Sequence, residues 1–93
     1  MEQFAEQLKA HLHAQGYATV QQIIVERRPD WSGEESLFIW LLLDDDVTDE
    51  DLSWKSLKPL HNETSRYTRQ AYPDLFPYVR ERRVVEWQDI VNA

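Results

Sequence analysis

The chain has 93 residues, enough for one domain over 1–93 and near the lower limit for a core without disulfides or metals. Its composition, 42% hydrophobic with four Trp, four Tyr and three Phe, predicts a compact core rather than a disordered segment. The absence of Cys excludes disulfides and thiolate metal sites, and the net charge of −7 argues against nucleic acid or an anionic membrane as the partner.

No stretch approaches the about 18 consecutive apolar residues that a membrane span needs. Residues 1–6 also lack the basic and apolar regions of a signal peptide. We therefore expect a cytoplasmic protein without a membrane partner.

An amphipathic helix is predicted for residues 2–15, where apolar or small side chains recur with 4-4-3 spacing. Gly16 follows the last of them, a common place for a helix to end. Residues 19–28 alternate like a strand, with Ile23 on one face and Val20 on the other. Because this segment is more polar than the next, we expect it near a sheet edge or covered on one face only.

The most apolar segment, residues 36–43, reads Ser-Leu-Phe-Ile-Trp-Leu-Leu-Leu and is followed by three aspartates. Both faces of such a strand are apolar, so both must be covered, which predicts the centre of a sheet. A buried helix could carry the same run, but eight residues are short for one. The turn-rich link at 29–34 predicts an antiparallel hairpin between residues 19–28 and 36–43.

A second helix is predicted from the stripe of apolar or small residues that runs from Trp54 to Ala71. Thr48 and the acids after it resemble a capping box at its start. Pro59 lies inside the stripe, so we expect either a kink or two helices.

A third strand is predicted near residues 78–86, with a terminal helix from about Glu81 as the rival interpretation. The predicted fold is a single α+β domain, a small two-layer sandwich with element order α-β-β-α-β and two helices on one face of the sheet.

The acidic segment 44–51 allows three interpretations. Its carboxylates could bind Mg²⁺ or Ca²⁺, but the segment lacks the glycine and the final glutamate of an EF-hand loop. It could contact a basic partner, or it could be a solvated loop before a helix. We favour the solvated loop and expect no metal and no cofactor. If the segment does contact a basic partner, the candidate residues are Asp44, Asp45, Asp46, Asp49, Glu50 and Asp51.

A small basic group, Arg80, Arg82 and Arg83, lies near Tyr78. Arginines beside aromatic rings are typical of surfaces that bind single-stranded nucleic acid. Alternatively, these arginines protect an edge strand by their charge or pair with glutamates across the sheet. The negative net charge of the chain favours this alternative over nucleic-acid binding.

The four tryptophans divide into two pairs. Periodicity places Trp40 and Trp54 in the core, whereas Trp31 and Trp87 have no periodic reason to be buried. Each of the latter two is a candidate contact anchor or a lid on a small core.

No catalytic set is apparent, since there is no Gly-x-Ser-x-Gly elbow, no Cys nucleophile and only two glycines for a phosphate loop. His11 and His13 are two residues apart on a helix and so cannot share a metal, and we expect both on the surface.

The element order resembles that of type II KH domains and of the ribosome-binding factors that share their layout. The resemblance is in element order alone and implies an RNA-associated role, but the Gly-x-x-Gly loop that grips backbone phosphates in KH domains is absent. Three hypotheses follow. The leading one is a non-enzymatic protein-interaction module, possibly self-associating through a sheet edge. The second is a KH-like RNA-associated domain that uses the arginine group, and the third is a small metal-dependent enzyme at the acidic segment.

Overall fold

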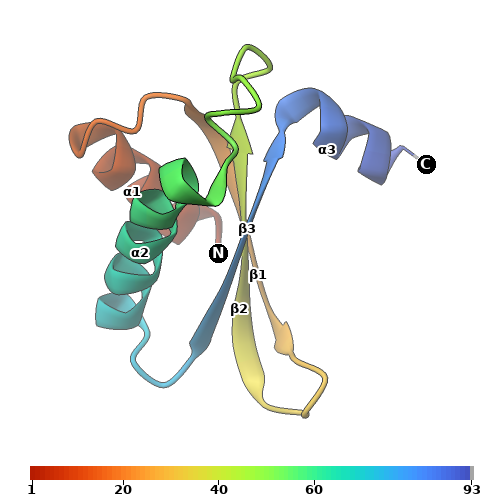
Figure 1. The fold of residues 1–93 in the computed structure, drawn as a ribbon. Helices are drawn as coiled ribbons and strands as arrows, with labels where there is room; N and C mark the ends of the chain where they lie inside the picture. The colour runs from red at the N-terminus through yellow and green to blue at the C-terminus, as the bar shows by residue number, and fades with distance from the viewer. Residues whose placement is uncertain (93) are drawn as a thin grey trace.

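The computed structural model describes residues 1–92 (Figure 1). Helices and strands follow one another as α1 (Glu2–Ala14), β1 (Val20–Pro29), β2 (Glu35–Leu43), α2 (Trp54–Ala71), β3 (Phe76–Arg83) and α3 (Val84–Val91).

The three strands form one mixed sheet in the order β1-β2-β3. β1 and β2 pair antiparallel, as the short link between them predicted, and β3 pairs with β2 in parallel because α2 carries the chain back along the sheet. The α+β class and the hairpin are confirmed, β2 is the central strand, and the more polar β1 is an edge strand.

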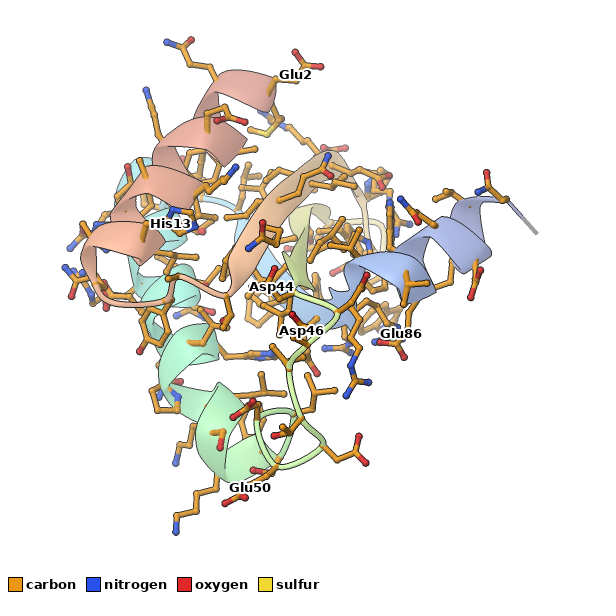
Figure 2. All side chains as sticks on the ribbon, turned by 90° about the horizontal axis from the view of Figure 1, so that it is seen from above. Glu2, His13, Asp44, Asp46, Glu50 and Glu86 are labelled. Carbon is orange, nitrogen blue, oxygen red and sulfur yellow. The ribbon has the colours of Figure 1, made fainter. Side chains whose placement is uncertain are left out.

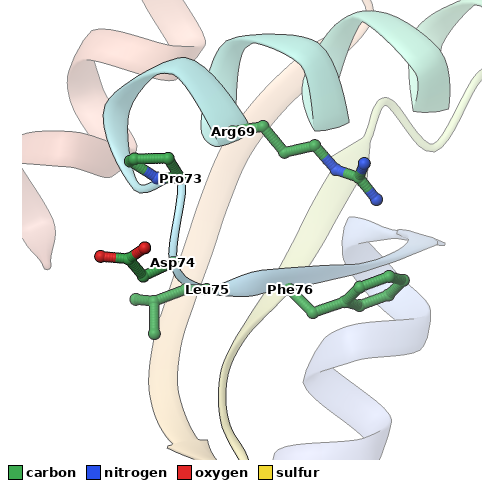
Figure 3. A pocket seen from close by; sticks show the side chains of 5 residues that line it. All are labelled: Arg69, Pro73, Asp74, Leu75 and Phe76. Carbon is green, nitrogen blue, oxygen red and sulfur yellow. The ribbon is translucent and has the colours of Figure 1, made fainter.

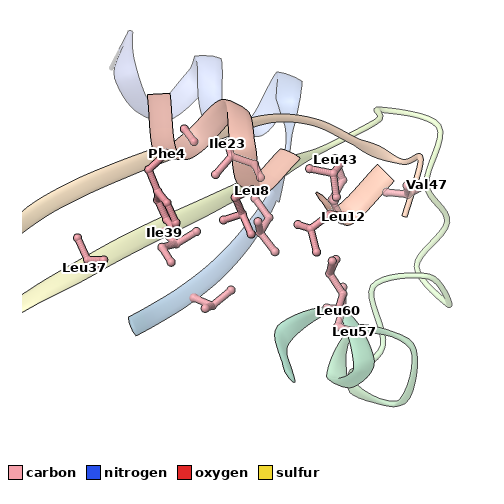
Figure 4. Close-up of a cluster of buried hydrophobic side chains, with 14 of the residues drawn as sticks. Phe4, Leu8, Leu12, Ile23, Leu37, Ile39, Leu43, Val47, Leu57 and Leu60 are labelled. Atoms are coloured by element: carbon pink, nitrogen blue, oxygen red, sulfur yellow. The ribbon is translucent and has the colours of Figure 1, made fainter. Parts of the chain in front are cut away.

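Helices α1 and α2 cover one face of the sheet, as predicted (Figure 1). The core lies between them and the odd-numbered residues of β2 from Leu37 to Leu43, all of which are buried (Figure 4). The helices contribute apolar side chains at helical spacing, which is the origin of the stripes seen in the sequence. The main members of this core are Leu8, Leu12, Leu37, Ile39, Leu41, Leu43, Leu57 and Leu60.

One strand residue lies on the opposite face from the prediction. Simple alternation puts Val20 and Ile23 on opposite faces, but the register shifts between Val20 and Gln22. This irregularity turns Val20 into the same core as Ile23, where it is fully buried.

The start of α2 also differs from the prediction. Thr48 and Asp51 do exchange the two hydrogen bonds of a capping box, but they close a turn rather than begin a helix. The helix begins at Trp54, and the Ser53 hydroxyl caps it by accepting from the Ser56 N–H. It then continues through Pro59 as one helix, so of the two expected alternatives, a kink or two helices, the division into two helices is wrong.

The C-terminal segment combines both rival interpretations. The third strand is confirmed, but it ends at Arg83, and α3 follows at once. The turn from strand to helix is made by carboxylates, because Glu86 accepts from the Arg83 N–H and Asp45 accepts from the Val85 N–H. This second cap comes from a loop forty residues away, so local sequence could not reveal it.

Candidate interaction surface

The second face of the sheet is only partly covered. Helix α3 starts at the end of this face nearest the loop after β2, and the half toward the β1–β2 turn has no helix over it (Figures 1 and 2). Residues paired across strands share a face, so the even-numbered residues of the three strands line it, except Val20, which the register shift turns into the core. We name this surface the open face; it consists of Gln22, Ile24, Glu26, Arg28, Ser36, Phe38, Trp40, Leu42, Phe76, Tyr78, Arg80 and Arg82.

An aromatic cluster occupies the uncovered half of the open face. The rings of Phe38 and Tyr78 are stacked with their centroids 5.0 Å apart, and Phe76 lies 4.8 Å from Tyr78. Trp31, from the β1–β2 turn, adds a fourth ring at 5.1 Å from Tyr78 and is 83% exposed. The cluster therefore ends in a large apolar side chain that the single chain leaves in water.

Asp30 holds this cluster in place. Its carboxylate accepts hydrogen bonds from the Ser32 hydroxyl at 2.6 Å and from the Tyr78 hydroxyl at 2.9 Å. The hydrogen bond from the Ser32 hydroxyl has the largest effect on the pKa of Asp30; burial opposes it, and the bond from Tyr78 adds to it, so that the pKa falls from 3.8 to about 2. The hydrogen bond to the Asp30 carboxylate raises the pKa of the Tyr78 hydroxyl. The turn that carries Trp31 is thus tied to β3 across the sheet.

Arginines flank the aromatic rings. The Arg28 guanidinium lies over the Phe38 ring at 3.8 Å from its centroid, and Arg82 lies 5.3 Å from the centroid of Trp40. Among residues 1–92, Arg80 and Arg82 donate only to backbone carbonyl oxygens next to them in the chain and form no ion pair with a carboxylate. Two guanidinium charges therefore remain uncompensated on this face.

Arg83 does not belong to this group. It turns to the opposite face, where it donates to the Val47 carbonyl oxygen at 2.9 Å and lies 3.3 Å from the Asp49 carboxylate. Its role is to hold the loop after β2, so the predicted trio is reduced to Arg80 and Arg82 beside Tyr78.

Helix α3 is apolar but has no buried residue. Its contact with the sheet is made by Trp87, whose ring lies 5.1 Å from that of Trp40. Ile90 and Val91 are at least half exposed, and Val85 nearly so. The only charged residues of the helix are Glu86 and Asp89. Seen from above, α3 extends away from the sheet on the side opposite α1 (Figure 2).

The acidic segment supplies structural contacts at several positions. Asp45 caps α3, Asp49 lies beside Arg83, and Asp51 bonds to the Thr48 N–H at 3.0 Å. Asp44 is partly buried, and the Asp46 and Glu50 side chains are exposed. Within the described residues, no group of three or more His, Asp or Glu side chains is placed to hold a metal ion.

The tryptophans are arranged differently from the prediction. Trp54 is 59% exposed, so its predicted placement in the core is wrong. The buried residues of α2 begin at Leu57, and Trp54 packs edge-on against His61. Trp40 and Trp87 cover each other and are both half-buried. The β1–β2 turn, which carries Trp31, and helix α3, which carries Trp87, lie at opposite ends of the sheet (Figure 1), and Asp45 of the acidic segment caps α3.

The histidines also differ from simple surface residues. His11 is partly buried and bonds to Glu63, and His61 bonds to Glu81 at 2.6 Å. Glu63 also accepts a hydrogen bond from Arg66. The bonds from Arg66, which has the larger effect, and from His11 lower the pKa of Glu63 from 4.5 to about 2. His13, at an exposed position, contacts the Val20 carbonyl oxygen. These pairs tie the helices to each other and to the sheet.

Beside the open face is an open pocket of about 470 Å³. In Figure 3 the Arg69 side chain reaches toward the Phe76 ring, and the guanidinium carbon lies 5.3 Å from the ring centroid. The other lining residues are Pro73, Asp74 and Leu75. The pocket is a lateral extension of the aromatic cluster.

Phe38, Phe76 and Arg28 were not singled out from the sequence. A signal for the rings was present at positions 38 and 40, two even positions of the strand that carry aromatic side chains, Phe38 and Trp40. What joins these rings to Phe76 and Tyr78 is the parallel pairing of β3, which the sequence does not specify.

The fold and this surface define a small α+β domain with a three-stranded mixed sheet, covered on one face and partly open on the other. No family model, no curated protein and no solved structure matches the chain. None of the helices within residues 1–92 combines the length and apolarity required to cross a membrane.

Proposed function

We propose that the chain is a non-enzymatic protein-interaction module that self-associates through its open face and α3. The observation that carries this proposal is the aromatic cluster with Trp31 83% exposed at its end. A single chain would gain free energy by covering these rings, and Trp, Tyr and Arg are the residues that dominate binding energy at protein interfaces.

The distribution of exposed apolar side chains supports the same surface. Within residues 1–92, the large apolar side chains left exposed on the open face, its turn and α3 are Trp31, Phe76, Val85, Ile90 and Val91, whereas Met1 and Trp54 lie elsewhere. These side chains form two exposed apolar groups, one at each end of the open face, and exposed apolar patches are typical of interaction sites. The proposed setting is the cytoplasm.

Light scattering coupled to size exclusion tests the proposal. We expect a mass above the 11.1 kDa monomer that rises with concentration, and a fall back to monomer for Trp31→Ser. Trp54→Ser is the matched control, because it removes another exposed Trp from a helix on the opposite side of the sheet. A wild-type monomer at about 1 mM would refute self-association.

Pairing through the free edge of β1 is the alternative form of self-association. The end of this strand carries Glu26, Arg27, Arg28 and Pro29, residue types that discourage edge-to-edge pairing. Edge pairing predicts that Trp31→Ser keeps the dimer, so the same measurement separates the two surfaces.

A second candidate function is association with single-stranded RNA. The observation in its favour is the combination of stacked rings with uncompensated Arg80 and Arg82. Titration of a fluorescein-labelled oligouridine at low salt should then show binding that weakens with salt and with Arg80→Glu. Unchanged anisotropy throughout the titration would remove this candidate.

A further inference from the structure

The open face and α3 have opposite character. The open face is aromatic in its uncovered half and carries Arg28, Arg80 and Arg82. Arg28 lies 3.8 Å from the Glu26 carboxylate and the Asp30 carboxylate is bonded to Tyr78, so the cations of this face without an ion pair among the described residues are Arg80 and Arg82. Helix α3 is apolar and acidic, and it has no basic residue. Both surfaces leave apolar side chains exposed, and their charges are of opposite sign, so they can cover each other with complementary charges.

The single chain does not satisfy this complementarity. Its own α3 covers Trp40 through Trp87, while Asp89 forms no ion pair or hydrogen bond among the described residues. Arg80 is exposed and is the neighbour of Tyr78 on the same face, so it lies at the border of the uncovered rings.

We infer that two copies associate by placing α3 of each across the aromatic half of the other's open face, with Asp89 of one copy beside Arg80 of the other. This inference rests on the proposed self-association and specifies which element of one copy covers the open face of the other. A two-fold axis makes the arrangement closed, since each copy supplies one helix and one face. Ile90 and Val91 would then be covered by Trp31 and Phe76.

Charge reversal by single substitutions tests the pairing. Arg80→Glu and Asp89→Lys each replace two attractive contacts per dimer by repulsive ones, so each variant alone should self-associate roughly thirty-fold more weakly. An equimolar mixture of the two variants should recover the wild-type mass, because both contacts of the mixed dimer again join opposite charges. The measurement is light scattering of each variant and of the mixture at low and high salt.

Matched controls separate pairing from net charge. Lys58→Glu and Glu6→Lys make the same changes in net charge on exposed helical residues of the covered side, and we expect wild-type masses for both and for their mixture. A wild-type dimer that survives both reversals, or a mixture that gains no mass over its components, would overturn the inference and leave the proposed self-association standing. A wild-type monomer would overturn both.

Discussion

Replacing Leu41 by Ala should remove a large part of the stability of this domain. Leu41 is 0% exposed at the centre of β2, between α1, α2 and the other strands. The substitution deletes about three carbon groups, each worth about 0.8 kcal/mol of transfer free energy. The cavity between two layers adds to this loss, for a total of about 4 kcal/mol.

The neighbouring Leu42 provides the comparison. It is 1% exposed, but it lies on the open face beside α3 and outside the main core. A short helix without buried residues can move to fill a void more easily than the core between two layers. We therefore expect Leu42→Ala to lower the free energy of unfolding by about 2.5 kcal/mol, which is close to the transfer free energy alone.

Urea unfolding followed by tryptophan fluorescence measures both values. A domain of this size has roughly 5–14 kcal/mol of stability, so Leu41→Ala should lower the midpoint by about 2 M without changing the slope. Lys55→Ala, an exposed helical position, is the control and should stay within about 0.5 kcal/mol of wild type. A cost below about 1 kcal/mol for Leu41→Ala would refute the central position of β2.

Three further predictions concern hydrogen bonds and backbone. Tyr78→Phe removes a donor to the Asp30 carboxylate, so the pKa of Asp30 should rise from about 2 toward 3.8, as measured by carboxyl-carbon NMR titration; an unchanged value would contradict the role of this bond. The pKa values of Asp30 and Glu63 are both lowered in the fold, so their contribution to stability is present above about pH 4.5 and should be lost as the pH falls toward 2. Urea midpoints across this range, with Glu63→Gln as the variant whose pH dependence is flatter, check the sign. Pro59→Ala restores a backbone donor inside α2 and should stabilise the protein by about 1–2 kcal/mol in thermal unfolding, whereas a loss of stability would show that Pro59 is required.

Local periodicity was sufficient for much of the fold. The spacing of Phe4, Leu8 and Leu12 predicts α1, and the apolar run in residues 36–43 predicts the central strand. Both follow from side chains that alternate or recur on one face of their own element. The predicted site residues were less complete, because Trp31 and Tyr78 were named without the rings of Phe38 and Phe76 that join them.

The remaining errors share one cause, which is contact between distant segments. Val20 enters the core through a register shift against β2, and β3 gives way to α3 where Asp45, from another loop, caps the helix. Trp54 fits the stripe of α2, but it is 59% exposed and packs against His61 of the same helix instead of the core. None of these positions carries a local signal.

The sequence by itself determined the secondary structure of most of the chain, the central strand and the charge of each segment, because these depend on residues within a few positions of one another. Only the tertiary structure decided which face stays open and which rings meet there. The parallel pairing of β3 with β2 places Tyr78 and Phe76 beside Phe38, and the Asp30–Tyr78 bond brings Trp31 to the same place. Strand order and register are set by the total burial of the whole chain, so no segment specifies them alone.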